Sequence, residues 1–159
     1  VAVCSLGWMY VPDPAAAARE LHRALRPGGR AIVAVWGERR HCGWAQIFPI
    51  VDARVASDVC PMFFALGAPG LLAKTLAGAG FVDVDDTRLD VDLVYADDEE
   101  ALGAAFAGGP VALAWSRFDH EQRKSAADEY LASIAGFTNG TGYRVPGQFV
   151  VATGRRPVT

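Results

Sequence analysis

The sequence has little cysteine and no excess of positive charge. Its 159 residues include three cysteines, Cys4, Cys42 and Cys60, an odd count without Cys-x-x-Cys spacing. We expect reduced thiols in a cytoplasmic protein rather than a disulfide framework. Lysine and arginine total 15 against 18 acidic residues, for a net charge of −3. Because nucleic-acid binding depends on positive charge, this balance argues against a DNA or RNA partner.

Long hydrophobic runs are also missing. No apolar stretch of the sequence reaches the length of a membrane span. The apolar start, Val1–Val11, lacks a basic leader and is interrupted at Gly7, so it does not resemble a signal peptide. The acids between Asp83 and Glu100 alternate with apolar residues, which indicates a solvated strand face followed by a helix start rather than a metal site. The expected partner is a small molecule or another protein, with no membrane and no metal.

The first residue is Val1 rather than methionine, and it opens directly on a strand-like run, Val1–Leu6. A first core strand usually follows some leader, because bare chain ends fray. We therefore expect the sequence to begin in the middle of a fold. An exposed sheet edge at Val1–Leu6 could pair with a second copy and give a homo-oligomer.

Residues 1–37 predict a β-α-β unit. Asp13 followed by Pro14 is a strong helix start, and Pro27-Gly28-Gly29 ends that helix. The next segment, Arg30–Trp36, is continuously apolar, which favours a strand covered on both faces. Strand, helix and strand in this order predict parallel pairing.

The rest of the chain predicts a helical cover over residues 38–67, followed by helices and final strands over 68–159, all within one partial domain. Pro49 should kink or restart the cover helix, and residues 60–64 read as an apolar loop. The β-like run Phe81–Tyr95 changes its apolar parity, which predicts a bulge or break near Asp85–Thr87. Further expected elements are helices over Pro69–Ala79, Asp97–Ala107 and Pro110–Phe118, a capped helix that begins at Asp119 and buries Ala127, Tyr130, Leu131 and Ile134, and a last strand over Gln148–Thr153.

Three segments together resemble the post-cofactor half of class I S-adenosylmethionine-dependent methyltransferases: Cys4–Pro14, the helix with Arg19–Arg26, and the turn Pro27-Gly28-Gly29. The type-11 group, to which the ubiquinone and menaquinone methyltransferases belong, is the most similar. The resemblance implies an α/β fold, namely the C-terminal part of a Rossmann-like, mostly parallel sheet with an antiparallel last strand and a helical cover. It also implies methyl transfer from S-adenosyl-L-methionine to a small molecule.

The sequence departs from this family in the cofactor motif. No strand followed by Gly-x-Gly occurs, and Gly78-Ala79-Gly80 ends a helix instead of starting one. Glycines at that turn let the backbone approach the ligand, and a carboxylate after the next strand holds the ribose. We therefore expect this chain alone to bind S-adenosylmethionine weakly or not at all.

The resemblance assigns candidate sites. Ser5, Leu6 and Gly7 lie at the carboxyl end of the first strand, where open α/β sheets bind ligands, and would contact the methionine part of the cofactor through backbone groups. An ordinary strand-to-helix loop is the alternative. Candidate substrate-lining residues are hydrophobic, and core packing is the alternative for each: Trp8, Met9, Tyr10, Trp36, Trp44, Phe48, Phe63, Phe64 and Trp115.

The only candidate for a catalytic group is His41, a general base just past the second strand. A surface or structural histidine is the alternative. A second function also remains open: a truncated, non-catalytic paralogue that serves as a ligand-binding or dimerisation module.

Overall fold

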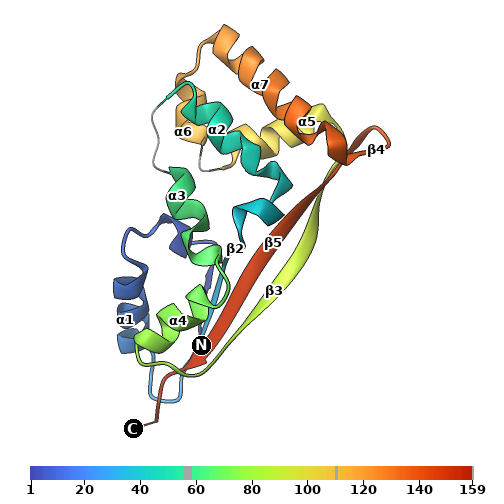
Figure 1. Cartoon of the computed structure of the whole chain (residues 1–159). Coiled ribbons are helices and arrows are strands. Elements are labelled where there is room, and N and C mark those ends of the chain that lie inside the picture. Colours follow the sequence, from blue (N-terminus) through green and yellow to red (C-terminus); the bar gives the residue numbers. More distant parts are fainter. Residues whose placement is uncertain (56–58, 110, 159) are drawn as a thin grey trace. The chain divides into compact units, whose positions relative to one another are not determined.

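The computed structural model describes residues 1–55, 59–109 and 111–158, without the side chains of residues 59–61 (Figure 1). The chain forms two compact units. Unit 1 contains Val1–Arg39, Pro61–Asp90 and Gln148–Thr159, and unit 2 contains Arg40–Cys60 and Val91–Gly147. No helix of the described residues is both long and apolar enough to cross a membrane.

Unit 1 begins with the expected β-α-β arrangement. Strand β1 (Ala2–Ser5) is followed by the 3-10 turn η1 (Trp8–Tyr10), helix α1 (Pro14–Ala24) and strand β2 (Arg30–Trp36). The Asp13 side chain caps α1 by accepting a hydrogen bond from the Ala16 N–H at 2.9 Å. At the other end, the Arg156 guanidinium donates to the carbonyls of His22, Arg23 and Leu25, which the last turn of a helix leaves without partners. This second cap has no signal in the local sequence.

The sheet is mixed. Its strands are ordered β1-β2-β5-β3, where β3 spans Val82–Tyr95 and β5 spans Gly142–Arg155, and β4 (Thr138–Asn139) pairs with β5. Strand β1 pairs with β2 in parallel, whereas β2 pairs with β5 antiparallel, from Arg30↔Arg155 to Trp36↔Phe149. The α/β class and the antiparallel last strand are confirmed. The expected mostly parallel sheet is not, because β5 inserts beside β2 in the described part and contributes antiparallel ladders.

The two faces of this sheet are buried to different extents. Ala31, Val33 and Val35 of β2 are at most 1% exposed. The alternate residues Ile32, Ala34 and Trp36 are only half-buried, and Val3 of β1 is 68% exposed. Among the described residues, the second face of Arg30–Trp36, which we expected to be covered, is therefore only partly covered.

Strand β3 is continuous, without the break expected near Asp85–Thr87. Its partly buried positions include Val84 and Arg88 in the first half and Val91 and Tyr95 in the second. The alternation of exposed and partly buried positions shifts by one residue at Leu89 and Asp90, which are both exposed. Arg88 takes an inward position because its guanidinium finds buried acceptors there, and apolar spacing alone cannot report such a partner.

Unit 1 also contains η4 (Ala65–Gly67) and α4 (Leu71–Gly78), and α4 lies beside α1 (Figure 1). The segment expected as an apolar loop forms helix α3 (Val59–Phe64) instead. His22 of α1 packs its ring edge-on against Phe81 with centroids 5.0 Å apart.

Unit 2 is mainly helical. It contains the 3-10 turn η3 (Gly43–Gln46), which follows η2 (Arg39–His41), and the helices α2 (Ile47–Asp52), α5 (Asp98–Leu102), η5 (Gly103–Ala107), α6 (Ala112–Arg117), α7 (His120–Ile134) and η6 (Ala135–Phe137). The helix restarts two residues before Pro49, whose missing N–H costs nothing in a first turn. The predicted cap at Asp119 is present at α7, where Asp119 and Gln122 form a capping box. That helix buries Ala126, Tyr130 and Ile134, so its inner face is centred on Ala126 rather than Ala127.

Helix α2 is tied to α7 by a charged side chain. Arg54, whose side chain is only 13% exposed, donates from Nη2 to Glu129 Oε1 at 2.6 Å and to Ser125 Oγ at 2.7 Å. Its Nη1 also donates to the Ile50 carbonyl at 2.6 Å. The hydrogen bond from Arg54 holds the pKa of the Glu129 carboxyl below its ordinary value. This interaction crosses between segments 75 residues apart and fixes the helix pair of unit 2.

Candidate functional site

The carboxyl end of β1 carries an unusual backbone conformation. Leu6 has φ of 59°, in the left-handed region that side chains other than glycine seldom occupy. Its N–H donates to the Ala34 carbonyl of β2 at 2.8 Å, so the ladder continues to this residue. Backbone strain of about 1–2 kcal/mol persists only where surrounding structure imposes it, and such residues cluster at binding sites. The strain falls within the predicted cofactor segment Ser5–Gly7.

Gly7 is tightly packed against the strand. A Cβ built on Gly7 would lie 2.8 Å from Cys4 Sγ, so a larger residue would push that side chain aside. Ser5 is exposed, and Leu6 and Gly7 are half-buried. The structure thus brings a strained residue and a closely packed glycine to the end of one parallel strand.

The aromatic turn that follows has two buried residues and one exposed residue. Trp8 and Met9 are 6% and 3% exposed, whereas Tyr10 is 52% exposed. Met9 Sδ accepts a hydrogen bond from the Trp36 N–H at 3.5 Å, which fixes η1 on β2. Tyr10 meets Phe63 edge to face with ring centroids 5.8 Å apart. Of the three, Tyr10 is the residue with free surface.

Other expected aromatic residues of unit 1 form pairs. Trp36 stacks on Phe149 with centroids 4.2 Å apart, on the half-buried face of the sheet. Phe63 is buried and lies 5.5 Å from the half-buried Phe64, edge to face. These pairs supply apolar surface within unit 1.

A polar cluster around the buried Gln148, which sequence reasoning missed, lies at the carboxyl end of β2. The Gln148 side chain accepts from Arg88 Nη1 at 2.7 Å and donates to Asp90 Oδ1 at 2.8 Å. Arg88 Nη2 also donates to the Gly67 carbonyl at 2.8 Å. The Gly37 N–H donates to the Gln148 carbonyl at 2.6 Å, so the cluster fixes the residue directly after β2. Glutamine and arginine on separate strands carry no sequence signal of this pairing.

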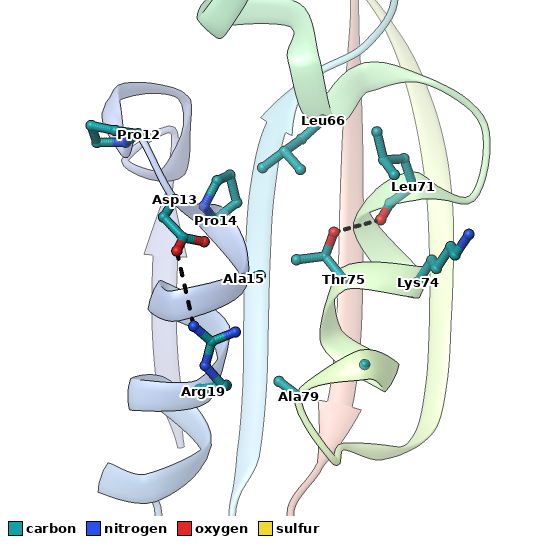
Figure 2. Close-up of a pocket in the computed structure, with 11 residues that line it drawn as sticks. Pro12, Asp13, Pro14, Ala15, Arg19, Leu66, Leu71, Lys74, Thr75 and Ala79 are labelled. Atoms are coloured by element: carbon teal, nitrogen blue, oxygen red, sulfur yellow. Dashed lines mark hydrogen bonds and ion pairs between the residues drawn. The ribbon is translucent and has the colours of Figure 1, made fainter.

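A groove between α1 and α4 was also missed (Figure 2). It is mostly apolar, with Pro12, Pro14, Ala15, Leu66, Leu71 and Ala79 among its lining residues. Arg19 lies on the α1 side and is paired with Asp13 at 3.9 Å, while Lys74 extends away from α1 (Figure 2). None of the residues selected from the sequence lines this groove. Small residues at Ala15, Gly78 and Ala79 leave the space between the two helices.

The remaining candidates belong to unit 2. Trp44 and Phe48 are buried, with ring centroids 5.9 Å apart. Trp115 is half-buried and stacks on Phe106 with centroids 4.0 Å apart. His41 is exposed in the turn η2.

The described residues fit only part of an S-adenosylmethionine site. Positive φ occurs at Gly28, Gly70, Gly80 and Gly140, and none of these follows β1 or β2. A turn that could cradle the ribose end of the cofactor is therefore missing from the described part of the chain. The strained backbone at Leu6 and the packed Gly7 fit the methionine end.

Comparisons with known proteins agree with this geometry. The model of a methyltransferase domain family matches residues 1–33. Over 154 aligned residues, the chain is 27% identical to nocamycin O-methyltransferase of Saccharothrix syringae, covering 88% of this chain and 55% of that protein. The chain thus spans about half the length of this curated relative.

Solved structures show the same fold. A protein of Bacillus halodurans C-125 that is assigned as a methyltransferase superposes with a TM-score of 0.56 at 15% identity, covering 98% of this chain and 63% of that one. Phosphoethanolamine N-methyltransferase 2 of Haemonchus contortus, solved with phosphomonomethylethanolamine and S-adenosylhomocysteine, gives 0.50 at 10% identity, covering 98% and 32%.

The fold is that of a class I methyltransferase, of which this chain contains a part. Over part of its length the chain is similar to methyltransferases: residues 1–33 match a methyltransferase domain family, and 154 residues align with an O-methyltransferase. The resemblance read from Val1–Trp36 is confirmed.

Proposed function

We propose that this chain is the C-terminal part of a methyltransferase that transfers a methyl group from S-adenosylmethionine to a small molecule. Nocamycin O-methyltransferase and phosphoethanolamine N-methyltransferase are named for small methyl acceptors, which supports this class of substrate. The chain covers 55% of the first and 32% of the second, so the cofactor site of the whole protein includes residues beyond this chain.

The observation that carries the proposal is the left-handed Leu6 at the carboxyl end of β1. Ligands of open α/β sheets bind at the carboxyl ends of the strands. Ser5, Leu6 and Gly7 contact the methionine end of the cofactor there through backbone groups. The Leu6 N–H is already bonded to Ala34, so its carbonyl and the groups of Gly7 are the ones available.

S-adenosylmethionine supplies an activated methyl group on a sulfonium. The group moves in line to a nucleophilic O, N or C atom, the S–C bond breaks as the new bond forms, and the nucleophile loses its proton to a base or to water. The task of this chain is to orient the acceptor, because such a displacement depends chiefly on alignment. Tyr10 offers an exposed ring for this purpose in unit 1, and the apolar pairs Trp36–Phe149 and Phe63–Phe64 lie in the same unit.

A general base is needed only for an acceptor that is not already electron-rich. His41 is our candidate, since it is an exposed imidazole in the turn soon after β2. Trp44 and Phe48 of unit 2 are buried and Trp115 stacks on Phe106, so the acceptor surface that we propose is the one in unit 1.

Calorimetric titration with S-adenosylhomocysteine tests this function. We expect weak or no binding to residues 1–159 alone, and micromolar or tighter binding once the gene's upstream sequence is restored. No binding by the longer protein would contradict the proposal.

A non-catalytic role is the second candidate, favoured by the edge position of β1. Val3 of this edge strand of the described sheet is 68% exposed, and Val1 just before it is 85% exposed. Unpaired edges of this kind recruit further strands. A dimer of the chain in light scattering that is lost in the Val3→Lys variant would support a dimerisation module, and a monomer at all concentrations would exclude it.

A further inference from the structure

Unit 2 has its own groove, of about 500 Å³, beside the helices α5, η5 and α6. Its lining includes Asp98, Glu99, Leu102, Phe106, Ala107 and Trp115. Phe106 is buried and stacks on Trp115, so the floor is a rigid aromatic pair. The exposed wall is a π-helix, Gly103–Ala107, a widened turn that recurs at functional sites and is otherwise disfavoured.

The charge along this groove has one sign. Among the described lining residues there are two carboxylates, Asp98 and Glu99, and no lysine, arginine or histidine. Arg123 lies outside it, with Cζ 5.7 Å from the centre of the Trp115 ring and Nη2 donating to the Ser116 carbonyl at 3.1 Å. An apolar floor with an anionic rim is complementary to a ligand that has an apolar body and one positively charged group.

Four acids lie around the start of α5, and three of them have hydrogen-bond partners. Asp97 accepts from the Glu100 N–H at 2.9 Å, and Glu100 accepts from the Ala96 N–H at 2.6 Å. Asp98 accepts from the Tyr143 hydroxyl at 2.6 Å. Among the described residues, Glu99 alone of the four has neither a hydrogen bond nor an ion pair.

The pKa values of two nearby tyrosines are raised. The hydrogen bond that Tyr143 donates to Asp98 raises the pKa of the Tyr143 hydroxyl. Burial, with a smaller contribution from the charge of Glu100, raises the pKa of Tyr95. The shift of Tyr143 reflects the carboxylate of Asp98, whereas the shift of Tyr95 is mainly an effect of burial.

We propose that this groove binds an apolar primary amine, with its hydrocarbon body on Phe106 and Trp115 and its ammonium group at Glu99. The groove lies within unit 2, and binding there requires neither S-adenosylmethionine nor methyl transfer. The proposal therefore stands apart from the function proposed above.

The test uses three ligands with one body: 3-phenylpropylamine, 3-phenylpropanol and 3-phenylpropanoate. Binding is followed by the chemical shifts of the backbone amides 98–107 and of the Trp115 indole N–H. We expect shifts confined to these groups and affinities in the order amine, alcohol, carboxylate. An exposed charge pair contributes up to about 1 kcal/mol, so the amine should bind about three- to fivefold more tightly than the alcohol.

Variants separate charge from shape. Glu99→Gln should remove the preference for the amine and leave the affinity for the alcohol unchanged. Glu121→Gln is the matched control, because Glu121 is an exposed acid in the first turn of α7 in the same unit and lies outside the groove. Ala107→Trp should obstruct the groove and weaken all three ligands, and because Ala107 is exposed, the core is untouched.

Three results would overturn the proposal. The first is equal affinity for amine, alcohol and carboxylate, or no binding of any of them. The second is an equal loss of amine preference in Glu99→Gln and Glu121→Gln. The third is a set of shifts that fall outside residues 98–107 and Trp115.

Discussion

The backbone of Gly67 packs directly on the carbonyl group of Gly37, and a Cβ on Gly67 would overlap the Gly37 oxygen and carbon. This contact joins η4 to the residue that follows β2. It lies beside the Arg88–Gln148 cluster, since Arg88 donates to the Gly67 carbonyl. The carboxyl end of β2 is therefore held by close backbone packing and by buried hydrogen bonds together.

Gly67→Ala should destabilise the protein by more than about 2 kcal/mol, because the atoms it meets are backbone and cannot rotate away. Urea denaturation measures the loss. Gly78→Ala is the control, since a Cβ there meets nothing within 4 Å and alanine favours the helix by up to about 1 kcal/mol. Equal stabilities of the two variants would show that the contact is looser than described.

The hydrogen bond between Arg88 and Gln148 should appear as an energetic coupling. Gln148→Leu removes the acceptor of the half-buried Arg88 Nη1 and the donor to the exposed Asp90, while Arg88 Nη2 keeps the Gly67 carbonyl, so the expected cost is roughly 1–2 kcal/mol. In a double-mutant cycle with Arg88→Met, the two losses should be less than additive by about 1 kcal/mol or more. Strict additivity would mean that the two side chains act independently.

The Arg54–Glu129 pair makes the stability of unit 2 depend on pH. Arg54 lowers the pKa of Glu129 in the folded state. The carboxyl of Glu129 has a pKa of about 4.3 in the unfolded chain and a lower pKa in the folded protein. The ion pair therefore stabilises the fold fully above about pH 4.3, and this stabilisation is lost as the pH falls through the pKa of the folded state. The stability gap between the wild type and Glu129→Gln should thus be present at pH 7 and narrow toward pH 3. Glu121→Gln should show no comparable change, and a gap independent of pH would contradict this assignment.

Leu6 should tolerate residues that accept a positive φ and reject those that do not. Leu6→Asn keeps a residue type that visits this region, whereas the β-branched side chain of Leu6→Val is strongly disfavoured there. We expect the valine variant to be less stable than the asparagine variant by about 1–2 kcal/mol in thermal unfolding. Equal stability would place residue 6 in ordinary extended backbone.

The sequence predicted the β-α-β unit because its signals are local. Asp13, Pro14 and the Pro27–Gly29 turn mark both ends of α1 without reference to any distant residue. Asp119 and Gln122 likewise mark the start of α7. The parity shift in β3 was misplaced because Arg88 faces inward toward Gln148, which lies 60 residues away.

The candidate site was only partly predictable for the same reason. The position of Ser5–Gly7 at a strand end follows from the sequence, whereas the left-handed Leu6 does not. The burial of Trp8 and Met9 depends on β2, which Met9 contacts through its sulfur. The sequence predicted one regular helix over Asp97–Ala107, but residues Gly103–Ala107 form a π-helix. The apolar pattern does not distinguish a π-helical turn from an α-helical one.

The most direct test of the proposed function maps S-adenosylhomocysteine onto the protein encoded by the complete gene. The backbone amides of Ser5, Leu6 and Gly7 are followed by NMR in protein labelled with nitrogen-15. We predict that these three amides shift on saturation, while the amide of Lys124, exposed on α7, does not. Saturable binding that leaves Ser5–Gly7 unshifted would contradict the claim that the carboxyl end of β1 holds the cofactor.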